Sequence, residues 1–233
     1  PYDVRDPVSD AISFFGREGL ADELASMLRL GRRIGLFGVH KIGKSSVMQR
    51  LRNKLEFPVA YVYLRKNDTL TAIYRRIVDA WNLDARIKYR DLNLESAFSG
   101  DTVVTQTDFE KLVKAYLVRL GTITDSPQVG VFLDEIEAII PYKKGDEATL
   151  TLYVTLMDCL RGLQHETGQL ALLVAGIYPS LGRVNYFWGE QKNPMHQVVT
   201  EYFLPPMSAE DCEIMIRSLG EQIRVTYDQG TVD

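Results

Sequence analysis

The sequence predicts an α/β fold in which a parallel sheet is covered by helices on both faces. Three observations lead to this prediction: short apolar runs alternate with segments of helical periodicity, a glycine-rich loop follows the first run, and two acidic residues end a later one. Apolar runs are typical of parallel strands, because helical crossovers bury both faces of such a sheet. The predicted strands are residues 34–37, 59–64, 129–133, 170–177 and 198–204. The predicted helices are residues 19–30, 45–55, 69–80, 108–120, 149–163 and 208–219.

The loop between the first strand and its helix reads Gly-Val-His-Lys-Ile-Gly-Lys-Ser and matches the pattern G-x-x-x-x-G-K-[ST]. Gly38 and Gly43 permit a turn that brings backbone N–H groups close to a phosphate chain, because no Cβ blocks the approach. Lys44 can reach the β- and γ-phosphates, and the Ser45 hydroxyl can ligate Mg²⁺. The His40 side chain is expected to be solvated, since such positions contribute backbone groups. The nucleotide-binding residues expected here are Gly38, Val39, His40, Lys41, Ile42, Gly43, Lys44, Ser45 and Ser46.

Residues 84–107 follow neither the strand pattern nor the helical pattern. This segment is polar, has weak periodicity and contains Ser-Gly-Asp at 99–101. We interpret it as an extended or mobile insertion with at most a short helix.

The predicted strand 129–133 ends in two adjacent acids, Asp134 and Glu135. Acids that follow a buried strand are often simply the start of a solvated loop. Downstream of a phosphate loop, however, a carboxylate in this place orients Mg²⁺, which suits Asp134. Glu135 can then polarise the water that attacks the γ-phosphate. The sequence therefore predicts Glu135 and Lys44 as catalytic residues, Ser45 and Asp134 as Mg²⁺ ligands, and ATP or ADP as the nucleotide. The Asn-Lys-x-Asp pattern by which GTPases read guanine is absent.

The last predicted strand is followed by Leu-Pro-Pro-Met-Ser at 204–208. The two prolines end the strand, and Ser208 can cap the next helix with Asp211 at its third position. We expect a domain boundary here, with one unit over 1–205 and the beginning of another over 206–233. The sequence is expected to be a piece of a larger protein.

Composition and net charge indicate in which cellular compartment and with which kinds of partner the protein is expected to act. The chain has 233 residues, 45% hydrophobic and 25% charged, as is usual for a globular protein. Its net charge of -4 gives no indication of nucleic-acid binding. Apolar runs of the ~18 residues that span a bilayer are absent. Cys159 and Cys212 lie within helical patterns, as expected for buried, reduced thiols. We expect a cytoplasmic protein without membrane contact.

Taken together, these motifs resemble the AAA+ superfamily of P-loop ATPases, and within it the STAND branch of signalling ATPases and the related archaeal origin-recognition-like ATPases. Three further stretches carry the resemblance. Residues 14–20, Phe-Phe-Gly-Arg-Glu-Gly-Leu, look like the family's Gly-Arg-Glu motif. Residues 174–180, Val-Ala-Gly-Ile-Tyr-Pro-Ser, occupy the place of its sensor strand. Residues 204–211 are similar to the leucine-x-proline-leucine-serine-x-glutamate stretch that leads into a helical lid.

The resemblance implies a P-loop NTPase core over 1–205 with strand order 5-1-4-3-2, and the start of a helical lid over 206–233. It also implies that Phe15, Gly16 and Arg17 pack against the adenine and ribose. The sequence departs from the family at the sensor strand, where Gly176 and Ile177 replace the usual polar residue. Tyr178 or Ser180 are the possible substitutes. Arg183 lies where an arginine finger could be, although a surface arginine is the alternative.

The function implied is a slowly hydrolysing, ATP-binding switch that gates oligomerisation of a larger signalling protein. Its expected partners are ATP and either further copies of itself or other domains of the same protein. Two alternatives stay open. One is a DNA-binding, initiator-like ATPase, against which the acidic charge weighs. The other is a scaffold that holds nucleotide without turnover, which the sensor position favours and Glu135 disfavours.

Overall fold

The computed structural model describes residues 14–89, 100–103, 105–222 and 224–225. Its centre is a five-stranded sheet in the order β2-β3-β4-β1-β5, and every neighbouring pair is parallel. The predicted α/β class and the strand order are confirmed. The strands are β1 (Arg33–Phe37), β2 (Val59–Tyr63), β3 (Val129–Asp134), β4 (Leu170–Gly176) and β5 (Thr200–Phe203). All residues of β3 and β4 are buried, as expected for strands covered on both faces.

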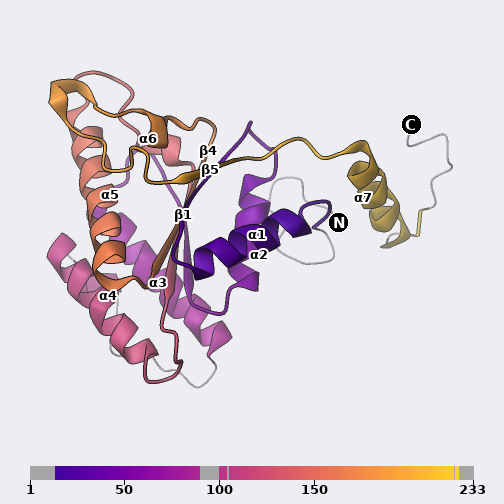
Figure 1. Ribbon diagram of the computed structural model, residues 1–233, viewed down its shortest axis with the longest axis horizontal. Helices are drawn as coiled ribbons and strands as arrows, with labels where there is room; N and C mark the ends of the chain where they lie inside the picture. The colour runs from indigo at the N-terminus through magenta and orange to yellow at the C-terminus, as the bar shows by residue number, and fades with distance from the viewer. Residues whose placement is uncertain (1–13, 90–99, 104, 223, 226–233) are drawn as a thin grey trace.

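Helices cover both faces of this sheet (Figure 1). The α-helices are α1 (Glu18–Arg29), α2 (Lys44–Lys54), α3 (Leu70–Lys88), α4 (Gln106–Leu120), α5 (Glu147–Thr167), α6 (Ser180–Arg183) and α7 (Ala209–Gln222). Short 3₁₀ turns are η1 (Gly100–Thr102), η2 (Ile136–Ala138) and η3 (Trp188–Glu190). Among the described helices, none combines the length and the apolar character needed to cross a membrane.

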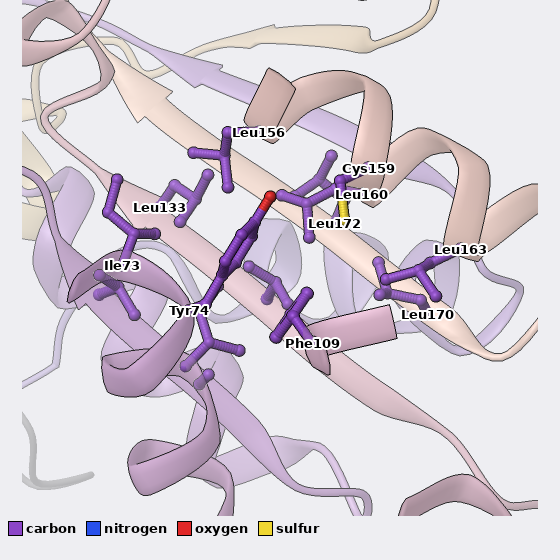
Figure 2. Packing of buried hydrophobic residues seen from close by; sticks show 14 of the residues in the cluster. Ile73, Tyr74, Phe109, Leu133, Leu156, Cys159, Leu160, Leu163, Leu170 and Leu172 are labelled. Atoms are coloured by element: carbon purple, nitrogen blue, oxygen red, sulfur yellow. The ribbon is translucent and has the colours of Figure 1, made fainter. Parts of the chain in front are cut away.

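Alternating strand residues divide the core into two clusters. On one face, Leu36, Phe132 and Leu173 pack with α1 and α2. On the other face, residues of β2, β3 and β4 pack with α3, α4 and α5. Figure 2 shows this second cluster, in which Tyr74 of α3 extends between the strands and α5. The Tyr74 ring stacks on Phe109 of α4, with 4.3 Å between ring centroids, and so joins three helices over one sheet face.

Side chains that accept from free backbone N–H groups fix several helix starts. Thr105 and Asp108 form a reciprocal capping box at α4, and the Asp146 carboxylate accepts from Thr149 N at α5. Ser208 Oγ accepts from Asp211 N at 3.0 Å, which confirms the predicted cap at residue 208. The α7 helix that this cap begins stands apart from the sheet, at the end of an extended segment (Figure 1).

The predicted insertion over 84–107 is wrong at both of its ends. The α3 helix continues to Lys88, and α4 already begins at Gln106. Between them Val103 is buried in the core, whereas residues 90–99 and 104 lie outside the described part of the chain. The polar character of the segment was misleading because one of its acids, Asp84, is buried. A second expectation fails at Cys212, which is only half-buried, while Cys159 is buried as expected.

The Asp84 carboxylate connects three elements at the amino end of β2, whereas the glycine-rich loop follows the carboxyl end of β1. It accepts from Arg52 Nε of α2 at 2.9 Å and from the backbone N of Val59 in β2 at 2.8 Å. It also pairs with Lys88 Nζ at 2.7 Å, one helical turn further along α3. These donors compensate a carboxylate that is only 3% exposed.

We expect Asp84→Ala to lower the free energy of unfolding by about 3 kcal/mol, because it removes the buried carboxylate that pairs with two half-buried cations. Urea unfolding measures this loss. The control is Asp158→Ala, which breaks an exposed i,i+3 pair with Arg161 and should cost at most about 0.5 kcal/mol. Equal losses in the two variants would contradict the role given to Asp84.

Candidate functional site

The glycine-rich loop joins the end of β1 to the start of α2. Gly43 has a φ of 103°, which side chains other than hydrogen rarely allow. A Cβ at Gly43 would lie 2.6 Å from Arg17 Nη1. A Cβ at Gly38 would lie 3.1 Å from both the Leu204 carbonyl oxygen and a methyl group of Ile42. The turn therefore requires glycine at Gly43, and neighbouring segments crowd both glycines of the motif.

Lys44 lies inside the curve of this loop and is only 6% exposed. Its ammonium donates to the carbonyl oxygens of Gly38 at 2.8 Å and Val39 at 3.1 Å. The N-cap residue of α2 is Gly43, which has no side chain with which to cap the helix, and the N-terminus of a helix favours an anion. The Val39, His40 and Lys41 side chains are exposed. A loop that encloses a cation and leads into a helix N-terminus is chemically suited to a phosphate chain.

Asp134 ends β3 with a carboxylate that is 1% exposed. Its Oδ2 accepts from Ser45 Oγ at 2.6 Å, so the sheet brings together the loop and the acidic strand end. Its Oδ1 accepts from the backbone N of Glu135 at 3.0 Å. A hydroxyl and a carboxylate are the oxygen ligands that Mg²⁺ prefers, and nucleotide phosphates and water usually complete its coordination. Ser45 and Asp134 therefore have the chemistry of Mg²⁺ ligands, the role for which the sequence suggested them.

Glu135 follows in a left-handed conformation, with φ 58° and ψ 50°. Burial raises the pKa of its carboxyl, and the negative charges of Asp134 and Glu137 act in the same direction. Lys44 and His40 lower it. A strained backbone and a raised pKa are both features of carboxylates that act as bases.

Tyr61 of β2 is a residue of this site that sequence reasoning missed. Its phenol donates to Asp134 Oδ2 at 2.5 Å, beside Ser45. Burial, followed by the negative charge of Asp134, raises the pKa of Tyr61 and keeps the hydroxyl protonated as a donor. Only the neighbourhood of β2 and β3 makes this contact possible, and no local pattern around Tyr61 encodes that neighbourhood.

The Gly-Arg-Glu segment lies directly on the loop. Arg17 Nη1 donates to the Ile42 carbonyl, and Nη2 donates to the Pro205 carbonyl at 2.8 Å. Gly16 has a φ of 70°, and a Cβ there would lie 2.5 Å from the carboxyl carbon of Asp211. Phe15 is half-buried. The segment thus connects the loop with the chain that enters α7.

The sensor strand ends without a polar side chain, at Gly176. Of the two possible substitutes, Tyr178 is 61% exposed, and Ser180 Oγ lies 3.3 Å from Tyr142 Oη. Arg183 forms an ion pair with Glu201 at 2.6 Å. A carboxylate that the sequence did not single out, that of Glu137, accepts from the backbone N–H groups of Ile177 and Tyr178.

We expect Tyr61→Phe to lower the free energy of unfolding by about 2 kcal/mol, because a buried carboxylate loses one of its donors. Tyr202→Phe is the matched control: Tyr202 donates to the exposed Glu23 at 2.8 Å, and its loss should cost at most about 0.5 kcal/mol. Urea unfolding of both nucleotide-free variants makes the comparison. A Tyr61 effect as small as that of Tyr202 would show that Asp134 does not depend on the phenol.

Comparison with known proteins agrees with this geometry. The chain is similar in structure to the Walker-type ATPase PABY2304 of Pyrococcus abyssi, with a TM-score of 0.68 and 15% sequence identity. The similarity covers 99% of this chain but only 65% of that one, so the chain spans about two thirds of its length. No curated protein matches the sequence. A family model described as "AAA domain" matches residues 30–183, which is more than half of the chain. The chain therefore belongs to the AAA domain family and has the fold of a P-loop ATPase.

Proposed function

We propose that the chain is the ATPase core of a molecular switch, which binds ATP with Mg²⁺ or retains ADP and hydrolyses ATP slowly. The contact between Ser45 Oγ and Asp134 Oδ2 carries this proposal. It supports the proposal because Ser45 of the glycine-rich loop and Asp134, which Glu135 directly follows, are in contact although they are far apart in the sequence.

In the proposed complex, the amides of the loop and of the first turn of α2, including those of Ile42 and Ser46, bind the phosphates. Lys44 turns from the loop carbonyls to the β- and γ-phosphates. Ser45 and Asp134 hold Mg²⁺, which supplies positive charge against the phosphate oxygens when bound. Phe15, Gly16 and Arg17 close over the nucleoside.

Hydrolysis would be an in-line displacement at the γ-phosphorus. Glu135 accepts a hydrogen bond from the attacking water and takes its proton as the new P–O bond forms. The bond from phosphorus to the bridging oxygen breaks, and ADP leaves. Lys44 stabilises the negative charge on the transferred group. The raised pKa of Glu135 improves its match to this role.

The switch itself would lie in the segment 206–233, which we propose as the beginning of a helical lid on the core 1–205. One contact links the two parts, because Asp211 of the proposed lid lies against Gly16 of the core. Arg17, next to Gly16, donates to the carbonyl of Pro205, the last residue of the core. The residues of the loop and those that enter α7 therefore share one guanidinium. We propose a STAND-type or origin-recognition-like protein of the cytoplasm, in which closure of the lid gates association with further copies or domains.

One observation favours a second function, that of a scaffold that holds nucleotide without turnover. Gly176 offers no polar side chain at the end of the strand next to the loop. In that case Glu135 would contribute nothing to a reaction.

Lys44→Ala should abolish measurable ATP binding while the fold persists, because the variant removes the ammonium group that the loop carbonyls hold. Calorimetric titration with ATP and circular dichroism measure the two properties. Lys114→Ala, which breaks an exposed pair with Glu166, is the control and should bind ATP like the wild type. Unchanged affinity in a folded Lys44→Ala variant would refute the assignment of the loop.

Glu135→Gln should preserve ATP binding and reduce turnover by roughly 10²–10⁴-fold, the range for loss of a positioned general base. The rate is measured with protein in excess over radiolabelled ATP, so that a single slow turnover is detected. Glu56→Gln, which alters an exposed pair with Arg29, controls for the loss of one charge. Equal slow rates in the wild type and the Glu135 variant would favour the scaffold.

A further inference from the structure

The last residue of β4, Gly176, has no side chain. The carboxylate of Glu137, from the η2 turn after β3, fills the space where a side chain would lie. A Cβ at Gly176 would lie 2.7 Å from a methyl group of Ile136 and 2.9 Å from the carboxyl carbon of Glu137. Both distances are too short for a real contact between these atoms. Glycine at this position is therefore a condition for the Glu137 side chain to lie where it does.

The Glu137 carboxylate holds the chain that leaves β4. Its Oε1 accepts from the backbone N–H of Ile177 and, at 3.3 Å, from that of Tyr178. Its Oε2 is buried and accepts from no group in the described part of the chain. The charge of this side chain therefore rests on main-chain amides, which favours a fixed position over a mobile one.

One peptide unit links this carboxylate to the phosphate loop. The carbonyl of Gly176 accepts from Gly38 N at 3.2 Å, and the N–H of the same peptide unit, that of Ile177, donates to Glu137. A peptide unit is planar and stiff, so its two ends cannot move independently. A displacement of Glu137 would displace the first residue of the loop.

Glu137 is also fixed relative to Glu135. The η2 turn holds the two together, because Ala138 N donates to the Glu135 carbonyl at 2.9 Å. Glu135 has a positive φ, which persists only where the surrounding structure imposes it. The bond from Glu137 to the end of β4 is one such restraint.

We propose that Glu137 is a positioning residue that takes the place of the missing sensor side chain. It joins the turn that carries Glu135 to the end of β4, and through the Gly176–Ile177 peptide to the start of the phosphate loop. It touches neither nucleotide nor attacking water. The inference rests on the proposed ATPase function, which it deepens by naming what aligns the base with the loop.

The first test uses nucleotide-free protein. Amide hydrogen exchange at Ile177 and Tyr178 should become about tenfold faster in Glu137→Ala, which removes the acceptor, and stay near the wild-type rate in Glu137→Gln, which keeps it. Gly176→Ala should destabilise the wild type more than it destabilises Glu137→Ala, where the carboxylate no longer occupies the space. Unchanged exchange in Glu137→Ala, or equal Gly176→Ala effects in both backgrounds, would overturn the inference.

The second test separates positioning from general damage. Glu137→Ala should reduce single-turnover ATP hydrolysis by about 10–100-fold with little change in ATP or ADP affinity, because the base and the loop lose their alignment. Glu137→Gln should restore most of the rate. A wild-type rate in Glu137→Ala overturns the proposal, and so does a parallel loss of affinity for both nucleotides. If the wild type itself neither binds nor hydrolyses ATP, the proposed function fails, and exchange and stability still decide whether Glu137 connects strand and loop.

Discussion

The buried carboxylate of Asp134 sets the conditions that the rest of the site has to meet. A charge that is 1% exposed is tolerated only when donors surround it. Those donors come from three places: Ser45 at the start of α2, Tyr61 in β2 and the main chain of Glu135. Each of them is correctly placed only if β2, β3 and the loop after β1 keep their registers. The architecture of the site thus depends on compensation of a buried charge in addition to apolar packing.

At three glycines of the site, neighbouring segments occupy the space where a side chain would lie. Arg17 lies against Gly43, the chain near Leu204 lies against Gly38, and Glu137 lies against Gly176. Every one of these neighbours comes from a different part of the chain. Because these residues have no side chain, groups distant in the sequence can reach the main chain around the loop. Arg17 and Glu137 bond to backbone groups there. Arg17 connects the loop to the segment before α7, and Glu137 connects η2 to the end of β4.

The sequence was informative wherever the chemistry is local. The spacing of residues from Gly38 to Ser45 predicted the phosphate loop. The adjacent acids Asp134 and Glu135 predicted the strand that ends beside it, and the family resemblance supplied the strand order. Tyr61 and Glu137 could not be found in this way, because their contacts depend on which strands are neighbours. The continuation of α3 was missed because a buried, compensated acid looks like a solvated one in a sequence. The roles of the site residues and the division at residue 205 remain predictions.

The central position of β4 also has a consequence for how the protein forms. The loop after β1 and the acid after β3 are separated by a strand that is synthesised later than both. Their contact therefore belongs to the pairings of long sequence separation, which slow folding because much of the chain has to be ordered first. A ligand that binds at this contact only in the folded domain would therefore stabilise that domain against unfolding.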